Sequence, residues 1–257
     1  MYLLGRRIGD IRRMVCVGLC VITAEMATAQ AISPDETGFK ALLQLKRMAT
    51  AQAISPAETL LFQTNHLQNI HEPVALTYAY KKVSTVEPSF EDEVHVDVTK
   101  INPDGSASVS MRFLSGTRKL EIPDVGDSQG NPALLGFLER DIAEMKRLTH
   151  GSTNYFRKRI RLALADAAQV RRVIFTYKGK QVEGQEVSVQ PYLNDPLHER
   201  FEKYVNKSYV FVISNQVSGG VYQIRTSSSG GWNGTMPQDK TFIEETLTLI
   251  KEGNSKF

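Results

Sequence analysis

The sequence predicts an α+β fold: a curved antiparallel sheet of about eight strands with an inserted helical hairpin on one face. Apolar and polar residues alternate in most segments after residue 73, as expected of strands with one buried face. Two consecutive segments near the middle of the chain instead have apolar residues at helical spacing. Strands and helices do not alternate along the chain, which argues against a doubly wound parallel sheet.

The first strands are expected to form a three-stranded meander over residues 73–122. Residues 73–83 and 91–101 alternate between apolar and polar side chains. The sequence Asn-Pro-Asp-Gly at 102–105 is typical of a hairpin turn, so the following apolar alternation predicts a returning strand.

Two helices are expected after the meander. Asn131 is a favoured N-cap residue, Pro132 is a favoured first helical residue, and Gly151 is a suitable C-cap for the helix between them. A second helix is expected at 154–168, where apolar residues share one face. The short connection predicts that the two helices lie antiparallel.

The rest of the predicted sheet consists of two hairpins and a closing strand, with a short helix starting at Asp195 and Pro196 between the hairpins. Gly184 is a candidate for a β-bulge, because glycine within a strand often marks one. The predicted segments are 173–177 paired with 181–192, 208–214 paired with 221–226, and 242–250.

The N-terminus has the pattern of a secretory signal peptide. Four arginines precede an uncharged run at 14–24, and an Ala-Gln-Ala site follows at 29–31. The run is shorter than the roughly 20 residues of a membrane span. We therefore expect cleavage after Ala31 and a periplasmic or secreted location. An uncleaved N-terminal anchor is the alternative.

The processing region is duplicated. Residues 26–37 read MATAQAISPDET and residues 48–59 read MATAQAISPAET, so the copies differ only at Asp35 and Ala57. The second Ala-Gln-Ala, at 51–53, is a possible cleavage site too, but the segment before it is interrupted by charges. The expected organisation is a signal peptide at 1–31, a flexible duplicated arm at 32–55 and a single α+β domain at 56–257.

Charge and cysteine content exclude several functions. The formal net charge of the chain is +3, which does not indicate a nucleic-acid partner. Both cysteines, Cys16 and Cys20, lie within the predicted signal peptide. The exported chain would therefore have no disulfide and no thiolate nucleophile. No cofactor is expected, and the sequence does not indicate an oligomeric state.

No motif predicts catalysis or a metal site. The sequence has no G-x-S-x-G, P-loop, glycine-rich dinucleotide turn or HExxH. Glu93, His95 and Asp97 share one strand face and could bind a metal, but this spacing is as expected of a solvated strand face, so no metal is predicted. A periplasmic hydrolase remains an alternative to a non-enzymatic function.

The strongest local signal is a basic cluster in the predicted helical hairpin. Between Arg140 and Arg172 there are nine basic residues and three acidic ones, a net charge of +6. A positive helical face attracts anionic lipids or an acidic partner, which suggests a cell-envelope interaction module. The alternative is a solvated face whose charges pair within the chain. The predicted partner-binding residues are Arg157, Lys158, Arg159 and Arg161.

Aromatic residues on the strands suggest a second site. Aromatic strand residues usually belong to the core, but they would line an apolar groove if helices did not cover the sheet completely. The glycine-rich segment 227–239 would then be a candidate lid. This favours a non-enzymatic periplasmic protein that binds a lipid or another apolar or amphiphilic molecule. The predicted ligand-binding residues are Tyr78, Tyr80, Phe113, Phe175, Tyr177 and Trp232.

Several short segments resemble an uncharacterised family of exported bacterial proteins. The resemblance spans about 60–225 and implies no known activity. Separately, a signal peptide followed by a curved antiparallel sheet with inserted helices is similar to the periplasmic lipoprotein-carrier (LolA-like) architecture, a resemblance of fold from which no residue role follows. The segments are Phe62–Leu67, Pro73, Tyr78, Asn131–Pro132, Phe137–Asp141, Tyr155–Arg161, Pro191–Tyr192, Asp195–Pro196 and Gly219–Tyr222.

Overall fold

A nine-stranded antiparallel sheet is the frame of the computed structural model, which describes residues 54–230 and 241–254. The predicted signal peptide, most of the predicted arm and Trp232 lie outside these residues. The strand order is β4-β3-β2-β1-β9-β8-β7-β6-β5. The strands are β1 (Val74–Ser84), β2 (Phe90–Ile101), β3 (Ala107–Phe113), β4 (Val125–Ser128), β5 (Gln169–Tyr177), β6 (Lys180–Val189), β7 (Ser208–Ile213), β8 (Val221–Ser229) and β9 (Thr241–Asn254).

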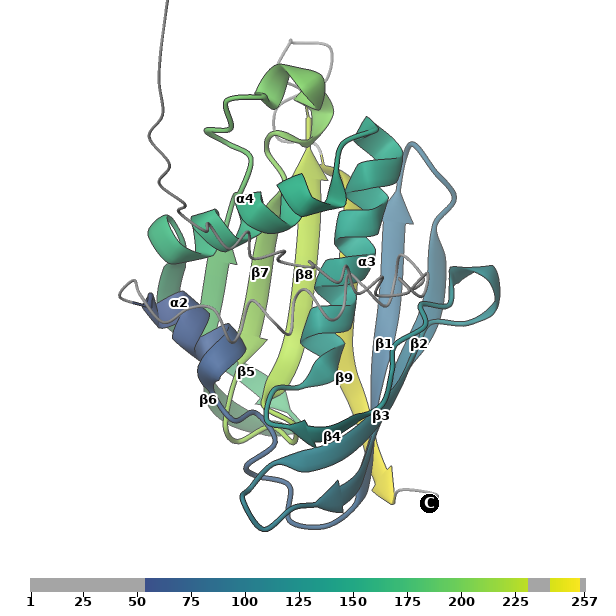
Figure 1. Cartoon of the computed structure of the whole chain (residues 1–257), viewed down its shortest axis with the longest axis vertical. Coiled ribbons are helices and arrows are strands. Elements are labelled where there is room, and N and C mark those ends of the chain that lie inside the picture. Colours follow the sequence, from purple (N-terminus) through teal and green to yellow (C-terminus); the bar gives the residue numbers. More distant parts are fainter. Residues whose placement is uncertain (1–53, 231–240, 255–257) are drawn as a thin grey trace, which may run out of the picture. The chain divides into compact units, whose positions relative to one another are not determined.

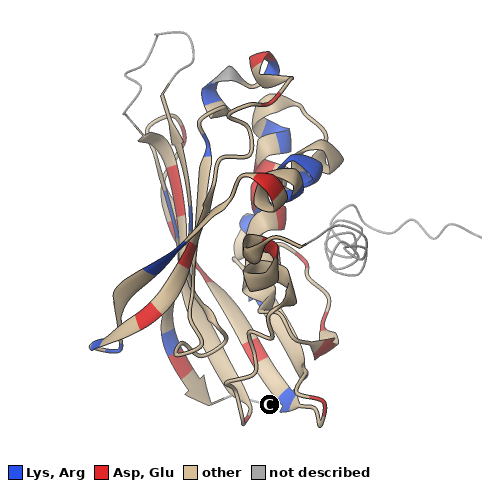
Figure 2. Ribbon diagram, turned by 90° about the vertical axis from the view of Figure 1, so that its left-hand side faces the viewer, with Lys and Arg blue, Asp and Glu red and all other residues tan. Residues whose placement is uncertain are grey.

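The helices cover one face of this sheet. They lie in front of the strands in Figure 1 and form a separate layer beside the sheet in Figure 2. The sheet is strongly twisted and curved, so the predicted α+β class is confirmed. The helical elements are α2 (Pro56–Glu58), the π-helical turn η1 (Thr59–Gln63), α3 (Pro132–Thr149), α4 (Thr153–Asp166) and the 3-10 turns η2 (Gly116–Arg118), η3 (His198–Arg200) and η4 (Glu202–Tyr204).

Helix α3 begins where the sequence predicts. The side chain of Asn131 accepts a hydrogen bond from the Ala133 N–H at 3.0 Å, and Pro132 is the first helical residue. At the other end, His150 rather than Gly151 has the left-handed conformation of the C-cap, with φ of 56°.

A glycine lets α3 approach the sheet closely. A Cβ atom at Gly136 would lie 2.7 Å from the ring of Phe113, which is fully buried. The helix therefore packs its backbone directly against an aromatic side chain of β3, and α3 covers the β1–β3 half of the inner face.

Helix α4 crosses α3 instead of running antiparallel beside it (Figure 1), so the predicted orientation of the pair is wrong. Its apolar face, Phe156, Ile160 and Leu164, is buried, and Phe156 makes edge contacts with the rings of Tyr192 and Phe201. These aromatic partners follow β6 in the sequence and belong to the half of the fold formed by β5 to β8. The helix turns away from α3 because its apolar face has to cover that half.

The short helix α2 is joined to α4 through its N-cap. Ser55 and Glu58 form a capping box, and the Ser55 hydroxyl also donates to the carbonyl oxygen of Leu164 at 2.9 Å. Ala57 and Leu61 are buried. The second copy of the duplicated segment is thus part of the folded core from Ser55 onward.

Two observed elements differ from the prediction. Strand β4 has no counterpart among the predicted strands, because its four residues are too few to show alternation. The expected helix after Asp195 is replaced by 3-10 turns: the Asp195 carboxylate accepts from the Leu197 N–H at 2.7 Å, which favours a turn over a helix. Within the described residues, no helix is both long and apolar enough to cross a membrane.

Candidate functional site

Three of the predicted ligand-binding aromatics lie in the core between the sheet and α3. Tyr78, Tyr80 and Phe113 are at most 1% exposed. The Tyr78 hydroxyl accepts from the Asn131 amide at 2.7 Å, and the Tyr80 hydroxyl donates to Glu245 at 2.8 Å. Burial raises the pKa of both phenols. These side chains are held by partners of their own chain.

A network of buried charges joins α3 to the same face of the sheet. Lys82 of β1 lies 2.8 Å from Glu87 and 2.6 Å from Glu144 of α3. Arg147, one turn further along α3, pairs with both of these carboxylates. Burial opposes ionisation, but the hydrogen bonds from Arg147 and Lys82 lower the pKa of Glu144 to about 2. The charged forms are therefore the stable ones.

A second group of buried charges continues the network toward β7 and β9. Arg140 donates to Glu245 at 2.9 Å, and Asp141 pairs with Lys207 and accepts from the Tyr209 hydroxyl at 2.6 Å. Removing one member of a buried pair leaves an uncompensated charge and is strongly destabilising. Opening the space between α3 and the sheet would break several such pairs at once.

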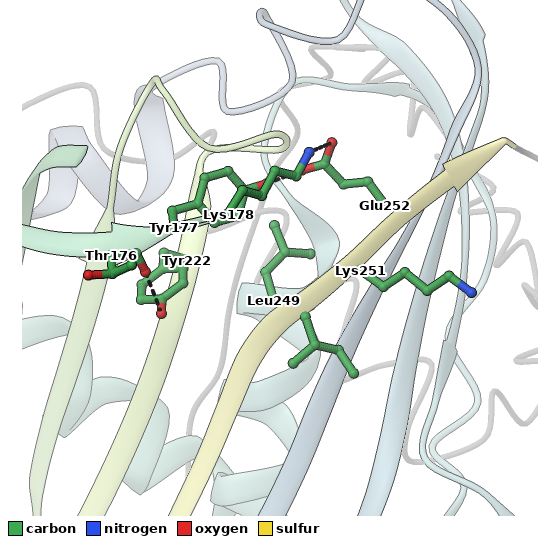
Figure 3. Close-up of a pocket in the computed structure, with 8 residues that line it drawn as sticks. Thr176, Tyr177, Lys178, Tyr222, Leu249, Lys251 and Glu252 are labelled. Atoms are coloured by element: carbon green, nitrogen blue, oxygen red, sulfur yellow. Dashed lines mark hydrogen bonds and ion pairs between the residues drawn. The ribbon is translucent and has the colours of Figure 1, made fainter. Parts of the chain in front are cut away.

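The opposite face of the sheet has a small open cavity. Its volume is about 160 Å³, and it lies between the tip of the β5–β6 hairpin and the ends of β8 and β9 (Figure 3). In Figure 2 this hairpin bends away from the helical layer. The residues that line the cavity are Thr176, Tyr177, Lys178, Tyr222, Leu249, Ile250, Lys251 and Glu252.

Strand register explains why Phe175 and Tyr177 lie on the face of the sheet opposite the helices. Phe175 is opposite Val182 and Tyr177 is opposite Lys180, both even-numbered positions of β6. Val187 and Val189, at odd positions of β6, are buried toward the helices. Because successive side chains alternate between faces, Phe175 and Tyr177 lie on the other side.

Two irregularities of the sheet meet at the cavity. The pairing of β1 with β9 shifts at Thr77 and Tyr78, which leaves Ile250 without an opposite residue. The pairing of β7 with β8 shifts in the same way and leaves Tyr222 unopposed. Both extra residues line the cavity, and Ile250 is 58% exposed. Bulges reorient side chains and are frequent next to functional sites.

The turn between β5 and β6 positions Tyr177 at the cavity. Lys178 and Gly179 both have positive φ, at 50° and 74°, as a two-residue type I′ turn requires. The turn places the Tyr177 ring 6.0 Å from that of Tyr222, edge to face, while Phe175 stacks on Tyr222 at 4.3 Å. The cavity thus has two aromatic walls and the aliphatic residues Leu249 and Ile250.

One carboxylate lies at the rim. Glu252 accepts a hydrogen bond from the Tyr177 hydroxyl and pairs with Lys178 at 2.9 Å. Burial raises the pKa of the Glu252 carboxyl. The lining residues include no histidine, cysteine or serine, and the cavity has a polar rim and apolar walls.

The four predicted partner-binding cations differ in whether they pair with carboxylates of their own chain. Arg157 donates to Glu139 through two nitrogens, at 2.7 and 2.6 Å, and Arg159 lies 2.6 Å from the buried Asp195. Lys158 and Arg161 are exposed. Two of the four charges are therefore neutralised within the chain, and the other two remain accessible to a partner.

The charged face of β2 lies on the exposed side of the sheet. His95 Nε2 lies 3.0 Å from Glu93 Oε2, and both side chains are accessible to solvent. Within the described ranges, no three His, Cys, Asp or Glu residues are placed to hold a metal ion.

The sequence analysis predicted one of the residues that line the cavity, Tyr177, as a ligand-binding residue, and the predicted Phe175 stacks on Tyr222 beside it. The sequence analysis did not single out Leu249, Ile250 or Glu252. Bulges at Tyr222 and Ile250 depend on the partner strands, so no local signal in the sequence marks them.

No family model and no curated protein matches this chain. The chain is similar to the solved structures of LprF from Mycobacterium bovis (13% identity, TM-score 0.30, 79% of this chain and 95% of that one) and of the lipoprotein LppX from Mycobacterium tuberculosis (10%, 0.33, 79% and 98%). It is also similar to a LolA superfamily protein from Nitrosomonas europaea (8%, 0.22, 80% and 96%). At these TM-scores the similarity assigns neither a site nor a ligand.

Proposed function

We propose that the chain is an exported, non-enzymatic protein that binds a small amphiphilic molecule in the cavity formed by Tyr177, Tyr222 and Ile250. The observation that carries the proposal is that two separate bulges, in β8 and in β9, direct side chains into one cavity. A solvent-exposed isoleucine beside two aromatic rings offers apolar surface to a ligand.

The cavity limits the ligand. Its volume of about 160 Å³ is below the roughly 300–1,000 Å³ typical of drug-sized ligand sites. It therefore suits a small molecule, or one end of a longer one, whose polar group meets Lys178 and Glu252 at the rim. Binding on the inner face is less favourable, because α3 would have to leave its ion pairs with Lys82 and Glu245.

The binding test uses 1-anilinonaphthalene-8-sulfonate, which combines an apolar ring system with an anionic group. Ile250→Asp should weaken its binding roughly tenfold, because a carboxylate replaces apolar contact surface. Val86→Asp is the matched control, since Val86 is 54% exposed and outside the cavity. Equal binding by the wild type and Ile250→Asp would reject this cavity as the site.

Export is part of the proposal and rests on the first 31 residues. N-terminal sequencing of the protein recovered outside the cytoplasm should give a chain that starts at Ile32. A start at Ile54 would make the second Ala-Gln-Ala the processing site. Retention of Met1 in a cytoplasmic protein would contradict export, while leaving the binding test unaffected.

A further inference from the structure

The two edges of the sheet are unequal. Strand β4 has only four residues, and short edge strands are one way in which proteins prevent sheets from joining. Strand β5, at the other edge, has nine residues and pairs with β6 without a bulge or a proline. Its Ile174 is 69% exposed, the highest exposure among the large hydrophobic side chains of the described residues.

The hairpin turn determines which backbone groups of β5 are free. Tyr177 and Lys180 flank the two-residue turn and form a hydrogen-bonded pair, so the odd-numbered residues of β5 bond to β6. The N–H and C=O groups of Val170, Arg172 and Ile174 point to the open edge. No described residue bonds to them there.

Among the described residues, helix α2 packs beside β5, and one side chain forms a hydrogen bond to a backbone group of this edge. The Tyr222 hydroxyl donates to the carbonyl oxygen of Thr176 at 3.3 Å. A carbonyl oxygen has two lone pairs and can accept a second hydrogen bond. The edge from Val170 to Thr176 is therefore competent to pair with another strand.

We propose that β5 pairs with β5 of a second copy of this chain, antiparallel and centred on Ile174. In this register Ile174 is opposite Ile174 of the other copy, and the exposed apolar side chains cover each other. Arg172 is opposite Thr176, and Val173 is opposite Phe175. The two sheets then form one continuous sheet across a two-fold axis.

Charge constrains the register of this pair. Arg171 and Arg172 are the only charged residues of β5. Centring the pair on either arginine would place like charges directly opposite each other, which is destabilising. Centring on Ile174 separates the arginines of the two copies. Arg171, which pairs with Glu186 of its own chain, then lies opposite Tyr177 of the other copy. The inference does not depend on ligand binding.

The test uses two charge variants, Ile174→Lys and Ile174→Asp, studied by sedimentation of the exported chain. The wild type should be a dimer. Each variant alone should be a monomer, because Ile174 faces its own copy and the pair would carry like charges. A one-to-one mixture of the variants should restore a dimer, because lysine then faces aspartate. Val86→Lys, at an exposed valine outside both the edge and the cavity, should remain a dimer.

Hydrogen exchange gives a second readout that does not depend on variants. The amides of Arg172 and Ile174 should exchange roughly tenfold more slowly at high protein concentration than at low concentration. A wild type that is monomeric at its highest soluble concentration overturns the proposal. The proposal is then wrong even if a different molecule pairs with β5. A mixture that stays monomeric overturns the register.

Discussion

Ala57 shows how one residue decides between the two copies of the duplicated segment. It is 2% exposed and lies in the hydrophobic core next to the α2 capping box. The first copy has Asp35 at the corresponding position. An aspartate in the buried position of Ala57 would lose its hydration without gaining a partner.

We therefore expect Ala57→Asp to lower the free energy of unfolding by about 2–4 kcal/mol. Urea unfolding followed by circular dichroism measures it. Glu58→Ala, which loses only the side chain that caps Ser55, should cost about 1 kcal/mol. If Ala57→Asp is as stable as the wild type, the segment after Ser55 is not part of the core, and either copy would serve.

Gly136 is the second residue at which the packing is tight. Alanine is favoured over glycine within a helix by about 1 kcal/mol. Here the new methyl group would lie 2.7 Å from the ring of Phe113, which is fully buried. We expect overpacking to win, so Gly136→Ala should destabilise the protein by about 1–3 kcal/mol. Gly126→Ala, with no atom within 4 Å of the new Cβ, should be close to neutral in the same unfolding assay.

At the scale of elements, the attachment of α3 to the sheet is partly electrostatic. Glu144 is the central carboxylate of this attachment, because it bonds to Lys82 of β1 and to Arg147 of its own helix. These hydrogen bonds keep its folded-state pKa, about 2, below the ordinary value of 4.5. A carboxyl with a lowered pKa stabilises the fold above its unfolded-state pKa and loses that contribution as the pH falls toward the folded-state pKa.

The wild type should therefore lose stability between about pH 5 and pH 2, with Glu144 contributing up to about 3 kcal/mol of the loss. Glu144→Gln should be less stable at neutral pH and should show a shallower loss over the same range. Glu91→Gln, at an exposed ion pair with Lys81, should leave the pH profile unchanged. Parallel profiles for the wild type and Glu144→Gln would contradict the role of Glu144.

For the whole molecule, the position of the last strand is decisive. β9 lies at the centre of the sheet, between β1 and β8, and joins the two halves of the fold. Its pairs connect the ends of the described chain, for example Tyr80 with Leu247. Contacts so distant in sequence form late, because a long loop must close first. The fold is complete only when the C-terminal strand has joined β1.

Hydrogen exchange should reflect this arrangement. The amides at the centre of β1 and β9 should exchange only on global unfolding, because both strands are paired on two sides. The amides of the edge strand β4 should exchange through local opening, at a much lower free energy. Exchange of β9 as fast as that of β4 would mean that the C-terminal strand opens independently, contrary to its central position.

The sequence by itself determined the elements and their class. Alternation marked the strands around Val94 and Val96, and Asn131 with Pro132 marked the start of α3, because caps and periodicity are local properties. Short or irregular elements such as β4, and the turns after Asp195, could not be read from alternation.

Only the tertiary structure decided which aromatics face the core and which face solvent. Tyr80 and Tyr177 are both aromatic strand residues, yet one is buried beneath α3 and the other lines the open cavity. Which face a side chain occupies depends on the register of its strand and on the helix that covers it. The cavity depends further on the bulges at Tyr222 and Ile250, which exist only relative to the neighbouring strands. Pairing between strands distant in sequence forms only in the assembled sheet, and therefore it cannot be predicted from any one segment of the sequence.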